Sequence, residues 1–366
     1  MKSRYIRIWA CLVAVVLLVA GSVLGVSAAE GSAPDKVYVG GMPFGVKFYT
    51  EGILVVGFCD VDVAAGSRHI NPARDAGLRE RDVIIKINGA EPSNASALTQ
   101  AVEASGGKPI NLTVKRCVAG SVAGARKSSA SRTGGGGTSE LTISVTPAFS
   151  VSENRYKTGM WVRDSGAGIG TVTFIIPGSC AFAGLGHGIC DGDTGELVAM
   201  QRGQVTDVTV SGVERGEVGA PGAIKGYFAP GKTGTLLGNT DCGVFGIFSA
   251  LPAGAVTQLP VGHRHEVHEG EATILCTLDN GKAATYRVKI TSVDSSATDS
   301  KCFTLSVVDP ALLQKTGGIV QGMSGSPVIQ DGKLVGAVTH VLINDPTSGY
   351  GIFVDNMLAD MPDLLQ

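Results

Sequence analysis

A serine between two glycines stands near the C-terminal end of this 366-residue chain, in the run G-M-S-G-S-P at residues 322–327. A hydroxyl group on such a loop can attack a carbonyl carbon. The backbone N–H groups of Gly322 and Ser324 can then hold the oxyanion that forms. The run continues as a strand, an Asp331-Gly332 turn and another strand, which excludes the strand–turn–helix of the α/β-hydrolases. We predict that Ser324 is the nucleophile of an acyl-transfer reaction.

A serine nucleophile needs a base that accepts its proton, and three histidines are candidates. His187 precedes Ser324 in the glycine-rich run A-G-L-G-H-G-I-C-D and is our prediction for the base. His69 lies in the other half of the chain and would have to reach across domains. His340 alternates with apolar residues beyond the serine, so we interpret it as pocket lining or as a core histidine.

The remaining histidines cluster with acidic residues in the run H-R-H-E-V-H-E at 263–269. Metal binding by this run is an alternative that would make the protein a metallohydrolase. The spacing is not that of the helical H-E-x-x-H motif, and the run opens a hairpin. We interpret it as a solvated edge, and we predict neither a metal site nor a cofactor.

The elements that must position these residues are mostly strands. From Tyr156 to Phe353 the sequence is a series of β-branched runs separated by glycines, and glycine makes up 52 of the 366 residues. Closely spaced short strands over such a length indicate a β-barrel or a β-sandwich. The predicted fold is therefore mainly β.

The first half of the chain has a different pattern. The sequence predicts a short helix, a strand that ends in an Asn-Gly turn, a second helix and a half-buried strand, over residues 71–78, 81–89, 95–105 and 108–116. This order and its text resemble a PDZ domain, with Arg81 where that family usually has glycine. We place the domain at residues 37–147, with a flexible glycine- and serine-rich insert at 119–139.

The resemblance to PDZ domains also implies a peptide-binding site. The family holds a peptide terminus at an apolar-Gly-apolar loop, and the matching text here is Phe44, Gly45 and Val46. A bound peptide would add a strand to the edge of the sheet.

Residues 1–29 read as a segment for export. Three basic residues precede an almost wholly apolar run from Ile8 to Val26, and small residues follow it. The segment is a signal peptide or an uncleaved membrane anchor. A formal net charge of −2 argues against a nucleic-acid partner. In an exported chain Cys180 and Cys190 could form a bridge, and buried free thiols are the alternative.

The serine run and the hairpin after it resemble the serine loop of chymotrypsin-like proteases. The text at 308–327 and 336–351, together with the histidine segment at 185–194, resembles the stage IV sporulation protein B peptidases. This resemblance implies a chymotrypsin-like double β-barrel over residues 156–366. It also implies a serine endopeptidase that cleaves a membrane-bound regulatory protein, in the space between two membranes during spore formation.

The resemblance bears on the carboxylate that orients His187 as well. It points to Asp309, which lies shortly before the serine. A chymotrypsin-like barrel would instead lead one to expect Asp241, between His187 and Ser324. We predict Asp309 and keep Asp241 as the alternative. The alternative for the whole protein is a non-catalytic exported scaffold that displays its PDZ domain.

Overall fold

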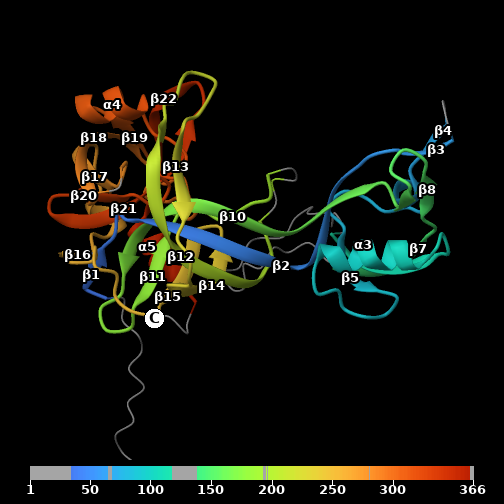
Figure 1. Cartoon of the computed structure of the whole chain (residues 1–366). Coiled ribbons are helices and arrows are strands. Elements are labelled where there is room, and N and C mark those ends of the chain that lie inside the picture. Colours follow the sequence, from blue (N-terminus) through green and yellow to red (C-terminus); the bar gives the residue numbers. More distant parts are fainter. Residues whose placement is uncertain are drawn as a thin grey trace, which may run out of the picture. The chain divides into compact units, whose positions relative to one another are not determined.

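The structure is a computed structural model that describes residues 34–64, 68–117, 138–192, 195, 197–279 and 281–362 (Figure 1). The predicted export segment at 1–29 and nearly all of the predicted flexible insert at 119–139 lie outside these residues. Within the described ranges, no helix is long and apolar enough to cross a membrane. Strands make up most of the described secondary structure, so the prediction of a mainly β protein is confirmed.

A first barrel is closed by six antiparallel strands. Each strand pairs with two neighbours in the ring, and the pairing of β10 with β2 closes it. In ring order the strands are β2 (Pro43–Phe58), β10 (Met160–Ile175), β11 (Ala181–Gly184), β15 (Gly243–Phe248), β14 (Gly234–Thr240) and β12 (Met200–Glu214).

A second closed barrel follows in the chain, again with six strands. In ring order these are β17 (Gly270–Cys276), β18 (Ala284–Val293), β19 (Phe303–Val307), β22 (Asp345–Phe353), β21 (Lys333–Leu342) and β20 (Pro327–Gln330). Helix α4 (Pro310–Thr316) connects β19 to the serine run, and α5 (Val354–Ala359) follows β22. The two barrels confirm the predicted double β-barrel.

Several short elements lie outside the two rings. Strand β1 (Lys36–Val39) pairs with β10 and with β16 (Gln258–Pro260), and a 3₁₀ turn, η1 (Arg264–Glu266), precedes the second barrel. Strand β13 (Ala223–Phe228) pairs with the C-terminal part of β12, so the two strands form a hairpin that extends beyond the first barrel.

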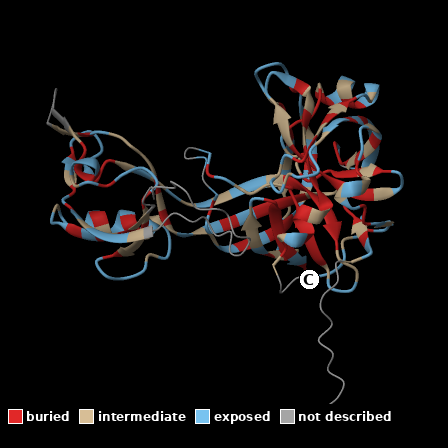
Figure 2. Cartoon of the chain, turned by 180° about the vertical axis from the view of Figure 1, so that it is seen from behind, coloured by how far each residue is buried: buried red, intermediate tan, exposed pale blue. Residues whose placement is uncertain are grey.

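The buried side chains form three clusters (Figure 2). One fills the first barrel around Phe44, Phe182 and Phe248. A second and larger cluster fills the second barrel and includes residues of the first, such as Phe174 and Phe245. Because the two barrels share this cluster, the loops at their junction rest on a common core.

The third cluster belongs to the part that resembles a PDZ domain. Its described elements are the C-terminal part of β2, β3 (Val61–Ala64), β4 (Arg68–Ile70), α2 (Pro72–Asp75), β5 (Val83–Ile87), α3 (Ala95–Ala104), β6 (Ile110–Cys117), β7 (Thr138–Val145), β8 (Ala148–Ser150) and β9 (Arg155–Lys157). Helix α3 presents Leu98 and Val102 to the core, as their spacing predicts.

The strand pairing differs from the domain boundary that we predicted. We placed the start of the PDZ domain at Val37, but β1 and the N-terminal part of β2 belong to the first barrel. The physical reason is the length of β2 and β10, which have 16 residues each. Each strand contributes one end to the barrel and the other to the PDZ-like part, so a single sequence cut does not separate the two.

Candidate active site

The serine loop between α4 and β20 is held in place by strand β10 of the other barrel. The backbone N–H of Thr171 donates to the carbonyl oxygen of Ser324 at 3.0 Å, and the Thr171 hydroxyl donates to that of Gly322 at 2.7 Å. The Thr173 hydroxyl donates to the carbonyl oxygen of Gly325 at 2.8 Å. These bonds join the serine loop of the second barrel to the first.

Two glycines give the loop its shape. Gly322 has a φ of 97° and Gly325 a φ of 93°, values that favour glycine. A Cβ atom on Gly325 would lie 2.0 Å from the carbonyl oxygen of Thr171 and 2.5 Å from the backbone nitrogen of Leu185. Only glycine therefore allows the serine loop to approach the segment that carries His187.

The backbone N–H groups of Gly322 and Ser324 donate no hydrogen bond to any other part of the chain that the structure describes. The amides of Met323, Gly325 and Ser326 by contrast bond to carbonyl oxygens. Within residues 322–326, the two amides that we predicted as oxyanion donors are thus the two without an acceptor in the part of the chain that the structure describes.

The two serines of the run differ in their surroundings. Ser324 is half-buried, and its hydroxyl donates to the carbonyl oxygen of Thr339 at 2.7 Å. Ser326 is fully buried, and its hydroxyl has no hydrogen-bond partner among the described residues. This difference favours Ser324 as the nucleophile, because a substrate carbonyl has no access to a fully buried hydroxyl.

His187 follows β11 on a tight turn against the second barrel. Leu185 and Gly186 have positive φ values, and a Cβ atom on Gly186 would lie 2.9 Å from the Thr339 methyl carbon. The turn therefore rests on the residue that accepts the hydrogen bond of Ser324. The structure thus brings the segments of His187 and Ser324 together, as a base and its nucleophile require.

The imidazole of His187 forms its hydrogen bond with a backbone group. Its Nδ1 lies 2.8 Å from the carbonyl oxygen of Gly188, an acceptor, which places a proton on Nδ1. Nε2 is then the unprotonated nitrogen that can accept a proton. Burial lowers the pKa of His187, while the bond to Gly188 opposes that shift.

His340, which we interpreted from the sequence as pocket lining or a core histidine, lies beside the base. Its ring centroid lies 4.7 Å from that of His187, and its buried Nδ1 has no partner among the described residues. Burial, followed by the charges of His187 and Lys301, lowers its pKa to about 4. A neutral His340 adds no charge that would oppose a proton on His187.

The structure does not bring Asp309 to His187. Asp309 is the N-cap of α4, and one of its carboxylate oxygens accepts from the amides of Ala311 at 3.0 Å and Leu312 at 3.3 Å. The other oxygen accepts from the amide of Arg287 at 3.2 Å. These bonds, led by that of Arg287, lower the pKa of Asp309. Its role as the orienting carboxylate stays a prediction, and its contacts are those of a helix cap.

Asp241, the alternative, lies in the turn between β14 and β15. Its charge contributes to the raised pKa of Cys190, after burial, which places it near the segment of His187. Thr240, the residue before Asp241, also lies close to this segment, because a Cβ atom on Gly188 would lie 2.7 Å from its carbonyl oxygen. His187 follows the third strand of its barrel and Asp241 the fifth, so the fold brings their two turns together.

The residues that we predicted to bind a peptide terminus lie in the first barrel and not in the PDZ-like part. Phe44, Gly45 and Val46 lie in β2 and pair with β10 on one side and β12 on the other. Phe44 and Val46 are buried in the first barrel. Because both edges of this segment are already paired, its amides have no room for a peptide, and the assignment to the PDZ domain must be corrected.

The PDZ-like part has a groove elsewhere. A cavity of about 290 Å³ lies between α3 and residues 155–162, and Leu98, Thr99, Val102 and Trp161 are among its lining residues. Leu98 and Val102 were recognised from the sequence only as a helix face for packing. Nothing in the sequence showed that the residues opposite them come from β9 and the segment after it.

The other candidate groups have ordinary partners. His263 pairs with Asp355 at 3.0 Å and His268 with Asp331 at 2.9 Å, while Glu266 pairs with Lys333. These pairs fit the interpretation of residues 263–269 as a solvated edge. Cys180 and Cys190 are both free thiols.

Two closed six-stranded barrels, with a serine loop and a histidine turn at their junction, define a chymotrypsin-like serine endopeptidase. The chain belongs to the SpoIVB peptidase S55 family, whose model matches residues 154–358, more than half of the 366 residues. A PDZ domain model matches residues 71–116. The interpretation as a serine endopeptidase that acts on proteins or peptides is therefore confirmed, and the alternative of a non-catalytic scaffold is set aside.

Solved structures similar to this chain include those of Rv3671c from M. tuberculosis. The inactive form of its Ser343Ala mutant has 15% sequence identity and a TM-score of 0.29, and the match covers 53% of this chain and 82% of that one. The active form has 14% identity and a TM-score of 0.30, with 54% and 74% covered. A search of curated proteins found no match.

Proposed function

We propose that Ser324 is the nucleophile and His187 the general base of this endopeptidase. The observation that carries the proposal is the meeting of the two segments at Thr339 and His340, where Ser324 bonds to Thr339 and His187 packs on His340. The oxyanion site supports it, since the amides of Gly322 and Ser324 have no acceptor within the described residues.

The reaction follows from these positions. Nε2 of His187 takes the proton of the Ser324 hydroxyl as the oxygen attacks the substrate carbonyl carbon, and the N–H groups of Gly322 and Ser324 stabilise the oxyanion. The C–N bond then breaks, and His187 returns the proton to the leaving amine. Water releases the acyl group by the same steps. The hydroxyl must first leave the carbonyl oxygen of Thr339.

We propose further that the substrate is a membrane-associated regulatory protein, cleaved in an intermembrane signalling step of spore formation. Membership of the S55 family supports this role. The apolar N-terminal run supports export to an extracytoplasmic space, with or without anchoring in the membrane. The PDZ domain then binds a peptide terminus, and the groove beside α3 supports that part of the proposal.

The experiment compares the membrane proteins of sporulating cells that express either the native chain or Ser324→Ala. The proposal predicts a regulatory protein that is cleaved in the first strain and intact in the second. A cleavage pattern that is the same in both strains, with both proteins present at equal levels, would contradict it. The same comparison with the PDZ groove blocked by Thr99→Arg, a change at an exposed residue that lines the groove, tests the binding role.

A further inference from the structure

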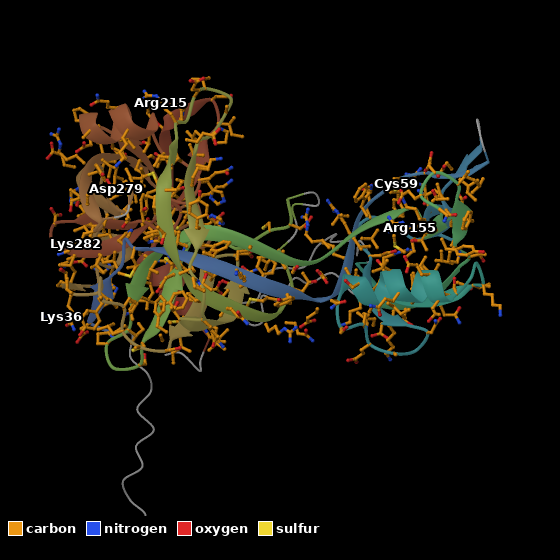
Figure 3. All side chains as sticks on the ribbon, viewed as in Figure 1. Lys36, Cys59, Arg155, Arg215, Asp279 and Lys282 are labelled. Carbon is orange, nitrogen blue, oxygen red and sulfur yellow. The ribbon has the colours of Figure 1, made fainter. Side chains whose placement is uncertain are left out.

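The hairpin of β12 and β13 reaches from the first barrel to the loops of the second. Strand β13 lies outside the ring and pairs with β12 from Val208↔Phe228 to Glu214↔Ala223. Figure 1 shows the end of this hairpin near α4 and β22, and Arg215 is labelled there in Figure 3. We call residues 214–224 the strap.

The strap is fixed at both sides of the serine loop. The Gly216 amide donates to the carbonyl oxygen of Thr316 at the end of α4, at 2.8 Å, and the Arg215 guanidinium donates to that of Gln314. The Gly219 amide donates to the carbonyl oxygen of Ile343, between β21 and β22, also at 2.8 Å. Residues 215–219 of the strap are therefore tied to two segments of the second barrel, one before and one after the serine loop in the sequence.

The C-terminal end of the strap contacts Gln321, three residues before the nucleophile. The Ile224 amide donates to the carbonyl oxygen of Gln321 at 2.8 Å, and the Gln321 amide donates to that of Gly222 at 2.8 Å. The two segments form a parallel bridge at Ala223 and Gln321. Gln321 is followed by Gly322, whose N–H group is one of the two oxyanion donors of the proposed function.

Because the peptide bond is planar, this contact also determines the direction of the Gly322 N–H group. The carbonyl group of Gln321 and the N–H group of Gly322 belong to one trans peptide, so they point in opposite directions. The hydrogen bond from Ile224 holds the carbonyl oxygen toward the strap, which turns the N–H group away from it. On the other side of Gly322, the Thr171 hydroxyl holds the next carbonyl oxygen. The position of Gly322 is thus fixed from both barrels.

The packing shows that the strap is a firm support. Ile224 is buried in the cluster that also contains Ile319, Val320 and Met323 of the serine loop. A Cβ atom on Gly322 would lie 3.0 Å from Cβ of Ile224, and one on Gly317 would lie 2.3 Å from the carbonyl oxygen of Gly216. Glycines at both positions allow the strap to contact the loop closely.

We propose that the strap is a positioning element, in which the Ile224 amide holds the Gly322 N–H in the direction that the oxyanion requires. The proposal rests on the proposed function of Ser324. Because an oxyanion exists only in the transition state, loss of this support lowers kcat and leaves KM nearly unchanged. A strap that merely formed a wall of the substrate pocket would change KM instead.

The test uses the full chain with Ile224→Pro, which removes the amide proton, and Ile224→Val, which keeps it and most of the packing. For Ile224→Pro we expect kcat to fall by about 10²-fold, in the range for loss of one oxyanion donor, with KM within about threefold. Affinity for a peptidyl trifluoromethyl ketone, whose adduct carries an oxyanion, falls in parallel. In the conservative Ile224→Val, we expect kcat and the affinity for the ketone to stay within about threefold of the native values.

A second variant guards against failure of the proline protein to fold. Glu214 and Ala223 are partners in the hairpin, so an Asn-Gly turn can replace residues 215–222 and keep both strands. This variant loses the anchors at Thr316 and Ile343 and the acceptor for the Gln321 amide. We expect kcat to fall by about tenfold at unchanged KM, with native circular dichroism.

Native kcat in either folded variant, or a loss that lies in KM alone, would overturn the proposal. Ser324→Ala is measured beside them. If that variant keeps its activity, the proposed nucleophile is wrong whatever the strap does. If Ser324→Ala is inactive and the folded strap variants are not impaired, the failure belongs to the strap alone.

Discussion

Asp309 is an acidic residue close to the serine in sequence, yet its carboxylate accepts three backbone N–H groups, two of them at the start of α4. The acceptor that fixes the tautomer of His187 is the carbonyl oxygen of Gly188. A backbone oxygen carries no sequence signal, so residue types could not have identified it.

The contacts of Asp309 lead to a prediction. Asparagine caps a helix about as well as aspartate, whereas alanine costs about 1 kcal/mol. If Asp309 acts as the helix cap alone, Asp309→Asn keeps turnover close to native and loses only the bond from the Arg287 amide, whereas Asp309→Ala loses about 1 kcal/mol of unfolding free energy with little change in kcat. Enzyme assays and urea denaturation measure both.

The outcome also decides between the two carboxylates. A loss of 10³-fold or more in kcat for a folded Asp309→Asn protein would show that this residue orients the base, since that is the order of magnitude for a missing triad carboxylate. Asp241→Asn, measured at the same folded fraction, is the matched comparison.

The pH dependence of the reaction follows from the burial of His187. Its ordinary pKa is about 6.5, and burial lowers it. The neutral form, which is the base, therefore persists below pH 6.5, and activity declines only as the pH falls through the lowered pKa. We expect the acid limb of kcat/KM to report a pKa below about 6.5 for the free enzyme. A limb at or above 6.5 would contradict the assigned base or its burial.

Some helices and strands could be predicted from the sequence, whereas the extent of others could not. The hydrophobic spacing of α3 and the glycine-separated strands of both barrels were predictable, because local patterns determine them. The ends of β2 and β10 were not, because each strand crosses from one core to another without a break in its pattern. The strap was missed for a different reason, since its hydrogen-bond partners, such as Thr316 and Gln321, are far from it in the sequence.

The turn before β5 in the PDZ-like part contains a residue with a strained backbone. Arg81 stands where the family usually has glycine, and its φ is 74°, in the left-handed region. A left-handed residue with a Cβ atom costs about 1–2 kcal/mol, and glycine avoids that cost. We expect Arg81→Gly to raise the unfolding free energy of this part by about 0.5–1 kcal/mol, since greater chain entropy offsets some of the gain.

Hydrogen exchange of the strand β5 amides measures this change in the full chain. Arg81→Ala is the control, because it shortens the side chain and keeps the strained φ. If Arg81→Ala stabilises as much as Arg81→Gly, side-chain contacts and not backbone strain account for the effect.

Strands β2 and β10 belong to both the first barrel and the PDZ-like part, which limits how the PDZ domain can be removed. A deletion of residues 37–146 would take β1 and β2 out of the first barrel and expose its core. Leu54 and Arg163 are partners in β2 and β10, so an Asn-Gly turn in place of residues 55–162 keeps the barrel closed. It also keeps Arg163, which pairs with the buried carboxylate of Asp191 at 2.6 Å.

We expect this shortened protein to fold, to react with a sulfonyl fluoride at Ser324 and to hydrolyse small esters, because every proposed catalytic group lies outside the removed residues. Selection of the protein substrate should be lost with the PDZ domain. A folded but unreactive protein would show that the PDZ domain takes part in forming the catalytic site. The deletion of 37–146 is the control that should not fold.

Covalent labelling of the full chain with a sulfonyl fluoride, followed by mass spectrometry, tests whether Ser324 attacks the substrate. We expect one modified residue, Ser324, together with loss of peptidase activity. We expect no labelling in Ser324→Ala and native labelling in Ser326→Ala, whose buried hydroxyl has no partner among the described residues. Labelling at Ser326, or peptidase activity that survives in a folded Ser324→Ala protein, would contradict the assignment of Ser324 as the nucleophile.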